Sequence, residues 1–447
     1  MATLALNSRD VRLETRPTLA YRVLLVFSFL YFARPEDVIP GLNHIPTEKI
    51  VGGIALLALI FGVRSHQRSA KWPTELKLLL ALFTWQCMSI PFAFYRTGAL
   101  MWVINKCSKA LIAAFLVSLI VDSISQVRQL ILIQAAAVAA MTLFSVLRYH
   151  GGRMGGVLGG VFDNPNDLAM NIALNWPLCW MFLLSSKNPL KKALWAAGML
   201  IMVRGVMLTY SRSGFLALLV GAALSLWEFG VRGKRYYLLG TALFLGMVFV
   251  ILGPSNYSDR IKSIFSDSDR SMDNGGTEIY GGDAREARIE MLKESLAVTA
   301  THPIFGVGPG QFEAYTNLWH VAHNTYTELS ADTGVPALGL FIGILVLAFR
   351  NLRRMRLTQA YKDSEEFRLL VGGLWAGMAS YVTGAMFANT GYQLFPYFMV
   401  GYTTALIRLL SPPIEDGLRV KVKSSMVSAN RVKRVRGQFT KEPLNRS

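Results

Sequence analysis

Long apolar runs alternate with short polar connections over most of this chain. A helix needs about 20 apolar residues to span a bilayer, and about twelve runs approach that length. Their centres lie near Phe27, Leu56, Leu82, Ala113, Ala136, Leu174, Met199, Val220, Leu245, Leu340, Ala376 and Val400. The pattern predicts an all-α, polytopic membrane protein of about twelve transmembrane helices, with one large extracytoplasmic loop between the ninth and the tenth.

The composition supports a membrane environment. The 447 residues are 52% hydrophobic and 17% charged, with a mean hydropathy of +0.36. An ordinary soluble domain is less apolar and carries more charge. The first apolar run shows no small-residue cleavage site, so we interpret it as a retained anchor rather than a removed signal peptide.

Basic residues predict the orientation of the helices. The net charge is +18, but Lys and Arg form short runs between apolar segments, which argues against a nucleic-acid partner. Cytoplasmic connections are the ones enriched in Lys and Arg. The basic runs in alternate connections lie around Arg64, Lys191, Arg235 and Arg353. Both termini are therefore predicted to be cytoplasmic in a multi-pass membrane protein.

The same pattern divides the chain into five segments. We predict a cytoplasmic N-terminus (1–17), transmembrane helices one to nine (18–253), a large periplasmic loop with an amphipathic helix (254–322), helices ten to twelve (323–411) and a basic, disordered cytoplasmic tail (412–447). Each basic residue of the tail adds about 1 kcal/mol of attraction to anionic membrane lipid. The unusual polar chemistry is predicted to face outward, away from ATP and nucleotide sugars.

His323 stands where the chain re-enters the membrane and is the candidate base. A histidine near neutrality can take a proton from an attacking hydroxyl. A loop histidine is also commonly structural, and His320 has the helical spacing to share a metal with it, although no third ligand is evident. Asn324 and Tyr326 follow directly, and we predict that they contribute to substrate binding.

Arg212, Arg285 and Arg288 are the candidate anion-binding residues. Arg212 lies where one apolar run ends and the next begins, a position that also suits an arginine reaching for the membrane surface. The other two begin a stretch whose apolar residues, from Ile289 to Val298, predict an amphipathic helix on the membrane. Positive charge is unfavourable at a helix start, which favours an anionic head group as their partner over a merely solvated helix face.

Three further basic residues lie inside predicted helices. Lys106 and Lys109 are three apart on one helical face, and Arg204 is close enough to its helix end to reach the surface. An unpaired charge inside the membrane costs several kcal/mol, so these residues are candidates for substrate binding. Guanidinium groups bind phosphate oxygens bidentately, so the outward-facing cations suit a pyrophosphate better than a neutral sugar.

Two short motifs indicate local structure. Gly306-Val-Gly-Pro-Gly310 lacks the lysine and the preceding strand of a P-loop, so it predicts a sharp turn that directs Gln311 and Phe312 inward. Asp163-Asn-Pro-Asn-Asp167 precedes an apolar run, and it predicts a helix start with Asn164 or the preceding aspartate as N-cap.

Five short motifs lie in order across about half of the chain. They are Asp163-Asn-Pro-Asn166, Ser211-Arg-Ser213, Arg288-Ile-Glu-Met-Leu292, His302-Pro-Ile-Phe-Gly-Val-Gly-Pro-Gly-Gln-Phe312 and His323-Asn-Thr-Tyr-Thr-Glu-Leu-Ser-Ala-Asp-Thr-Gly334. Their order and spacing within the helical frame resemble the bacterial O-antigen ligase and O-antigen polymerase superfamily. Leu292 departs from that pattern, since many relatives carry tryptophan there, and the change affects packing more than chemistry.

The resemblance implies a glycosyl transfer at the outer face of the bacterial inner membrane that needs no metal, no ATP and no other cofactor. The implied donor is a glycan on a polyprenyl pyrophosphate. The acceptor is a lipid A core sugar in ligases and another glycan repeat in polymerases. Carried over by motif, Arg212 and Arg288 bind the pyrophosphate and stabilise its developing charge, and His323 activates the acceptor hydroxyl.

Two other function classes are open at this point. A transporter or flippase for a lipid-linked or anionic sugar would use Lys106, Lys109 and Arg204 along its path. A non-catalytic receptor would bind carbohydrate in its outer loop without forming a product. Ligation and polymerisation share one cationic site and differ only in the acceptor, so the residues do not separate them.

Overall fold

The computed structural model describes residues 18–35, 47–62, 72–156, 164–243, 270–272, 278–316 and 321–410. Its fold is all-α, as the apolar runs predicted. The helices of the first half are α1 (Leu19–Ala33), α2 (Thr47–Gly62), α3 (Thr74–Ser89), the 3₁₀ turn η4 (Ile90–Phe92), α4 (Arg96–Trp102), the π-helical η5 (Val103–Cys107), α5 (Ser108–Ile120), α6 (Ile124–Leu147), α7 (Pro165–Ser185), α8 (Pro189–Thr209), α9 (Arg212–Ser225) and the π-helical η6 (Leu226–Val231).

The second half continues with α12 (Gly281–Thr301), α13 (Phe312–Thr316), α14 (Thr325–Met355), α15 (Gln359–Asp363), α16 (Glu365–Gly384) and α17 (Phe395–Leu410). One small antiparallel hairpin, β1 (Arg270–Met272) with β2 (Glu278–Tyr280), pairs Ser271 with Ile279. It belongs to the segment predicted as the long outer loop.

Among the described residues, six helices are long and apolar enough to cross a membrane. They are Arg96–Ile120, Ile124–Leu147, Pro165–Ser185, Pro189–Thr209, Arg212–Val231 and Thr325–Met355. Each predicted centre except Leu245 lies within a helix, and Leu245 lies outside the described residues. The multi-pass helical character is therefore confirmed, whereas the full set of about twelve spans stays a prediction.

α7 is the central helix of the bundle, since it packs against α6, α8, α9 and α16 and is buried along most of its length. Small residues allow this close approach, as is usual between membrane helices. A methyl group added at Gly214 of α9 would lie 2.2 Å from Cβ of Ala169, and one at Gly377 of α16 would lie 2.7 Å from the carbonyl oxygen of Leu174.

Buried polar side chains also join the central helices. Nε2 of Gln134 donates to Oδ1 of Asn175 at 2.8 Å, and the hydroxyl of Tyr402 donates to Oε1 of Gln134 at 2.7 Å. Nδ2 of Asn175 in turn donates to the carbonyl oxygen of Asn171 at 2.8 Å. These bonds connect α6, α7 and α17, and each contributes about 1 kcal/mol in a membrane interior.

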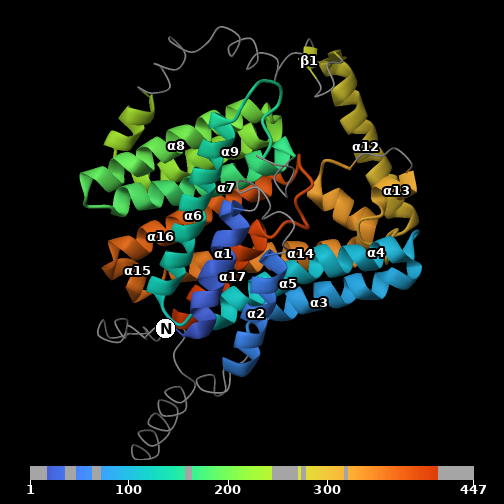
Figure 1. Cartoon of the computed structure of the whole chain (residues 1–447), viewed down its shortest axis with the longest axis horizontal. Helices are drawn as coiled ribbons and strands as arrows, with labels where there is room; N and C mark the ends of the chain where they lie inside the picture. Colours follow the sequence, from blue (N-terminus) through green and yellow to red (C-terminus); the bar gives the residue numbers. More distant parts are fainter. Residues whose placement is uncertain are drawn as a thin grey trace, which may run out of the picture.

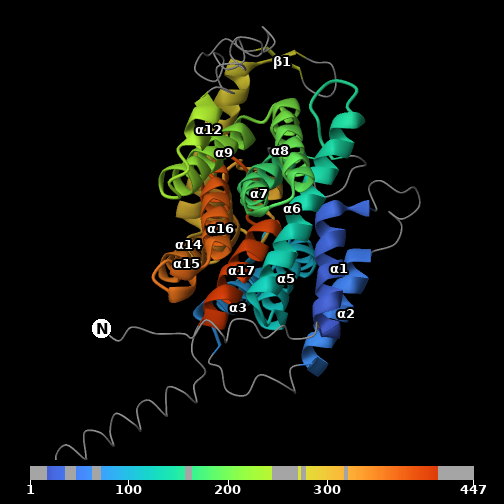
Figure 2. The same cartoon turned by 90° about the vertical axis from the view of Figure 1, so that its left-hand side faces the viewer.

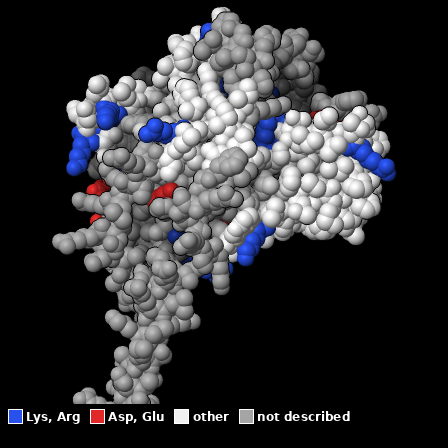
Figure 3. Space-filling view, turned by 60° about the horizontal axis from the view of Figure 1, so that its bottom comes forward, with Lys and Arg blue, Asp and Glu red and all other residues white. Residues whose placement is uncertain are grey.

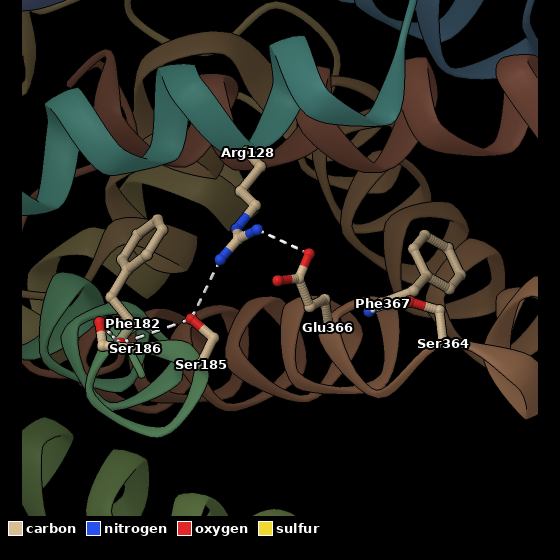
Figure 4. Close-up of polar contacts among 7 residues, drawn as sticks. All are labelled: Arg128, Phe182, Ser185, Ser186, Ser364, Glu366 and Phe367. Carbon is tan, nitrogen blue, oxygen red and sulfur yellow. Dashed lines mark hydrogen bonds and ion pairs between the residues drawn. The ribbon is translucent and has the colours of Figure 1, made fainter. Parts of the chain in front are cut away.

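Arg128 of α6 links the ends of α7 and α16 to α6 (Figure 4). Arg128 donates to the Glu366 carboxylate at 2.7 Å and to the Ser185 hydroxyl at 3.2 Å, and its guanidinium lies 6.0 Å from the ring centre of Phe182. Ser364 caps α16 by accepting from the backbone N–H of Phe367. This cluster is about 30 Å along α7 from the opposite helix start at Pro165, given a rise of 1.5 Å per residue.

α12 and the β1–β2 hairpin lie together at the other end of the molecule, away from α15, as Figures 1 and 2 both show. A small second core, made of Val298, Val307, Phe312, Ala322 and Ala331, holds α12 and α13 onto α14. We call this end the site end, because the candidate site residues gather there.

Lys and Arg form separate groups around a broad uncharged area in Figure 3. On this face, basic side chains do not merge into one patch, which agrees with their distribution in short runs along the sequence. A wide uncharged surface is the kind that faces lipid hydrocarbon.

A kink at Gly334 divides α14 and lets the preceding loop pack against it. Gly334 has φ 84° and ψ 167°, and just after it the N–H of Val335 donates to the carbonyl oxygen of Pro303 at 2.8 Å. A Cβ at this position would lie 1.9 Å from the carbonyl oxygen of Ile304. The loop before α13 is therefore seated on α14 only because this residue is glycine.

We expect Gly334→Ala to lower the free energy of unfolding by more than about 2 kcal/mol, because a left-handed φ and a backbone clash add together. The thermal midpoint of the detergent-solubilised protein measures this loss. Gly339→Ala is the matched control in the same helix, since a methyl group there meets nothing within 4 Å. Equal midpoints for the two variants would contradict the account of the kink.

Candidate functional site

His323 lies in a tight turn immediately before α14. Its φ of 51° is left-handed, a conformation that histidine adopts more readily than most side chains. Asn324 caps the helix, and its side-chain oxygen accepts from the N–H groups of Tyr326 at 2.9 Å and Thr327 at 3.2 Å. The turn thus holds the imidazole at a helix start, on a rigid element.

Glu328 and Thr325 secure this turn from inside the fold. Oε2 of Glu328 accepts from the N–H of Ala322 at 2.9 Å, and Oε1 accepts from the side-chain amide of Asn389. The Thr325 hydroxyl donates to the carbonyl oxygen of Ala388 at 2.6 Å and accepts from the N–H of Thr390 at 2.9 Å. The motif after His323 therefore connects its turn to the loop between α16 and α17.

His323 lines a cavity of about 190 Å³ at the site end. Polar side chains from three helices and two loops share this cavity with it. They include Trp102, Lys106, Asn166, Asp167 and Gln393. The cavity thus combines a possible base with cationic, anionic and amide groups.

Arg212 occupies the first turn of α9, directly after a sharp reversal of the chain. Tyr210 ends α8 in a left-handed conformation with φ 52°, and Ser211 caps α9 by accepting from the N–H of Gly214. Ser211 also contacts the Ser213 hydroxyl at 3.0 Å. These caps fix the exposed Arg212 at the site end of the α8–α9 hairpin.

Asn166 connects this hairpin to the start of α7. Its Oδ1 accepts from the Ser211 hydroxyl at 2.8 Å and from the Arg153 guanidinium at 3.2 Å. Arg153 also donates through Nε to the carbonyl oxygen of Thr209 at 3.2 Å. Asn166 also lines the cavity of His323. Its side chain therefore bonds to Arg153 and borders the same cavity as the candidate base.

Three arginines form a positive cluster beside this cavity. Desolvation, followed by the positive charges of Arg212 and Arg153, lowers the pKa of the Arg288 guanidinium. The Arg288 side chain is nevertheless exposed, so its desolvation is only partial. Repulsion by the two neighbouring guanidinium groups is therefore the more important cause of the lowered pKa. Like charges held this close indicate a site for a multiply charged anion.

Lys106 and Asp167 both lie on the wall of the cavity. Oδ2 of Asp167 accepts from Nε2 of Gln393 at 3.0 Å, and the Lys106 ammonium lies 5.9 Å from the ring centre of Trp102. The two side chains interact electrostatically. Lys106 belongs to the π-helical η5, an irregularity that often occurs at functional sites.

The glycine-rich turn binds a carboxylate of the protein itself. Asp332 accepts from the N–H groups of Gly310 at 3.0 Å, Gln311 at 3.1 Å and Phe312 at 3.0 Å, and from the Tyr392 hydroxyl at 3.0 Å. Gln311 and Phe312 are both buried, which confirms the predicted sharp turn with inward side chains. The turn is a structural anion nest rather than a phosphate loop.

The remaining predicted residues are not gathered in this way. Arg204 is exposed on α8, and the Lys109 side chain is half-buried in α5 and does not line the cavity. The Tyr326 hydroxyl donates to the carbonyl oxygen of Val382 at 2.9 Å, so both Tyr326 and the capping Asn324 have structural partners. The Arg285 side chain lies outside the described residues, and binding roles for all of these stay predictions.

α12 packs through one face and leaves part of its predicted apolar stretch exposed. Met291, Ser295 and Val298 are buried, whereas Ile289 and Leu296 are exposed. α12 contacts α14, and the Thr299 hydroxyl lies 2.8 Å from that of Ser330. The exposed apolar pair agrees with an apolar face free for the membrane, which stays a prediction.

A metal site has no support in the parts of the chain that the structure describes, which contain no group of three or more His, Cys, Asp and Glu side chains placed to hold an ion. His320, which has the spacing to pair with His323, lies outside those parts.

Sequence reasoning missed Arg153, Asn166, Asp167, Glu328 and Asp332. The Asn-Pro-Asn-Asp motif predicted only a helix cap, which is confirmed for Asn164, yet Asn164, Asn166 and Asp167 also line the cavity. A signal was present in the polar residues just inside the apolar runs, since buried carboxylates in a membrane protein usually mark a site.

The fold is that of a multi-pass helical membrane protein with a cluster of arginines at one end. Residues 197–342, roughly a third of the chain, match the family model described as O-antigen ligase. This match supports membership of the O-antigen ligase superfamily and a membrane enzyme of the O-antigen ligase or polymerase type. The matched segment contains Arg212, Arg288 and His323 but not Arg153 or Asn166.

The other comparisons add little. A search of curated proteins finds no match. One solved chain, from a study described as "Structural coordination of polymerization and crosslinking by a peptidoglycan synthase complex", shares 14% identity over 76% of this chain and 98% of that chain, with a TM-score of 0.43. No conclusion about this protein is drawn from so weak a similarity.

Proposed function

We propose that this protein transfers a glycan from a polyprenyl pyrophosphate to an acceptor sugar at the periplasmic face of the bacterial inner membrane. The observation that carries the proposal is the position of Asn166, which bonds to Ser211 and Arg153 beside Arg212 and also lines the cavity of His323. The candidate base His323 and the arginine cluster therefore lie next to each other. Membrane lipid, a lipid-linked donor and a lipid A core or glycan acceptor are the partners in this proposal.

The arginine cluster suits the diphosphate of the donor. Guanidinium groups form bidentate bonds with phosphate oxygens. Arg212 and Arg153 both repel Arg288, and a diphosphate bound among them relieves this repulsion. As the sugar–phosphate bond breaks, negative charge grows on the leaving diphosphate, so fixed cations stabilise the transition state more than the ground state.

His323 acts as the general base in this reaction. It takes the proton of the acceptor hydroxyl while that oxygen forms a bond to the anomeric carbon of the donor. The bond from this carbon to the diphosphate oxygen breaks, and the polyprenyl diphosphate leaves with the electron pair. The step needs neither a metal nor ATP, because the diphosphate is already a good leaving group.

A strain deleted for this gene tests the proposal through its surface glycans. A ligase predicts long glycans that are not attached to lipid A core, whereas a polymerase predicts attached single repeats. The purified protein in vesicles should release polyprenyl pyrophosphate from a lipid-linked glycan. Movement of labelled substrate across the vesicle with all bonds intact would instead support a transporter or flippase.

Asn166→Ala should reduce kcat/KM for glycan transfer by about tenfold, because Arg153 and Ser211 both lose the side chain that positions them beside Arg212. The affinity for inorganic pyrophosphate should fall together with the rate, and isothermal titration measures it. Asn188→Ala, which removes the N-cap of α8, is the matched control for an asparagine loss away from the site. An unchanged pyrophosphate affinity in Asn166→Ala would contradict the positioning role.

A further inference from the structure

The cavity beside His323 differs chemically from the arginine cluster. Its walls include Trp102, Lys106, Asp167 and Gln393, and none of the three described arginines of the cluster lines it. Lys106 is the one Lys or Arg among the described residues that line it, so this cavity offers a diphosphate fewer cationic partners than the arginine cluster does. The inference below rests on the proposed function and concerns the second substrate.

Lys106 and Asp167 share this cavity without touching each other. No hydrogen bond or ion pair joins them in the described part of the chain, so the Lys106 nitrogen and the Asp167 carboxyl oxygens are more than 4.0 Å apart. Of the two Asp167 carboxylate oxygens, Oδ2 accepts from Gln393 and Oδ1 has no hydrogen-bond partner within the described chain. An ammonium group and a carboxyl oxygen that do not reach each other leave hydrogen-bonding capacity unused at a membrane site, so the arrangement favours a polar ligand that bridges them.

A sugar ring has the properties that this cavity requires. The volume of about 190 Å³ is well above the minimum of about 15 Å³ that one water molecule needs, so the cavity has room for a small polar ligand such as a sugar ring. Neighbouring ring hydroxyls can accept from an ammonium group and donate to a carboxylate. The Trp102 indole offers an apolar surface for the C–H groups of the ring.

We propose that this cavity is the acceptor subsite and binds one hydroxyl-rich sugar ring. Asp167 accepts a hydrogen bond from one ring hydroxyl, Lys106 donates to the oxygen of a neighbouring hydroxyl, and Gln393 holds the Asp167 carboxylate in place. His323, on the same wall, faces the hydroxyl that attacks. The donor diphosphate and the acceptor ring thus occupy separate subsites that meet at Asn166.

Binding measurements on the full-length protein in nanodiscs test this subsite. A panel of methyl hexopyranosides is the acceptor probe, measured by saturation-transfer NMR, and undecaprenyl pyrophosphate is the donor probe. We expect Asp167→Asn and Lys106→Gln to weaken binding of the glycoside at least tenfold and to change the pyrophosphate affinity less than twofold. Arg212→Ala should give the opposite pattern, and Lys77→Gln on the exposed face of α3 is the charge-matched control.

Gln393→Leu is a second variant, because it leaves both charges in place and removes only the bond that orients Asp167. It should weaken glycoside binding by a smaller factor than Asp167→Asn, with the thermal midpoint verifying that each variant is folded. Loss of pyrophosphate affinity in Lys106→Gln with unchanged glycoside binding would overturn the proposal and assign the cavity to the donor. Failure of every glycoside to bind the unsubstituted protein would overturn it as well.

The two proposals fail in distinguishable ways. Glycoside binding needs no turnover, so a protein that binds the glycoside through Asp167 and transfers no glycan supports the subsite and refutes the enzyme proposal. A protein that transfers glycan while Asp167→Asn keeps its acceptor KM supports the enzyme proposal and refutes the subsite.

Discussion

Replacement of His323 by alanine should reduce the rate of glycan transfer by about 10²- to 10⁴-fold, which is the usual contribution of a positioned general base. His323 lines the cavity next to Asn166, Asp167 and Lys106, and its turn is fixed by the cap at Asn324 and by the Ala322–Glu328 bond. The loss should therefore appear in kcat, since the group acts on the proton that moves in the transition state. Release of polyprenyl pyrophosphate from a lipid-linked glycan measures it.

His323→Asn is the control for the backbone. The φ of 51° at this position strains most side chains, but asparagine tolerates it well. His323→Asn should thus lose as much activity as His323→Ala while it retains more of the stability. Both variants should keep their affinity for undecaprenyl pyrophosphate, because the arginine cluster is untouched. Activity within threefold of the unsubstituted protein in both variants would exclude His323 as the base.

Loss of Arg212 or Arg288 should reduce transfer by about 10²- to 10³-fold for each alanine substitution, the magnitude seen when one preorganised charge donor is removed. Arg212 and Arg153 both lie close enough to Arg288 to repel its charge. A diphosphate neutralises this repulsion, so each substitution should also weaken undecaprenyl pyrophosphate binding. The combined variant should lose less than the product of the single losses, because the residues act on one group.

Two comparisons make this prediction specific. Arg212→Lys and Arg288→Lys keep the charge but not the bidentate geometry, so they should recover part of the activity. Lys191→Ala, at an exposed position near the start of α8, is the control for a lost positive charge and should leave the rate unchanged. Raising the salt concentration should weaken pyrophosphate binding to the unsubstituted protein, because exposed charges are screened. Full activity of the Arg212→Ala, Arg288→Ala double variant would remove the basis of the anion site.

The candidate site was predictable in part, and the residues that were found share a common feature. Arg212, Arg288 and His323 each interrupt or border an apolar run, where a charged or titratable side chain stands out against its surroundings. Arg153 lies in a glycine-rich connection, and Asn166 and Asp167 lie in a motif that a helix start explains completely. Their second role depends on partners such as Ser211 and Gln393, which are 45 and 226 positions away along the chain.

The glycine-rich turn illustrates the same limit. Its residues predicted a sharp reversal, and the structure has one, because Gly306, Gly308 and Gly310 adopt positive φ values. The carboxylate that the turn binds is Asp332, which the sequence presents as one polar residue in the start of an apolar run. No local pattern indicates that its side chain turns back toward the loop across the kink at Gly334.

The sequence by itself determined that this is a helical membrane protein, where most of its helices lie and which family it resembles. These properties depend on the composition of contiguous segments and on short motifs, and both can be read along the chain. Only the tertiary structure decided that Asn166 joins Arg153 to the α8–α9 hairpin, that Lys106 and Asp167 share a cavity with His323, and that Asp332 fills the glycine turn. Contacts of this kind are set by how helices pack against α7 and α14, and the close approach of helices depends on small residues and buried polar bonds at positions far apart in the sequence.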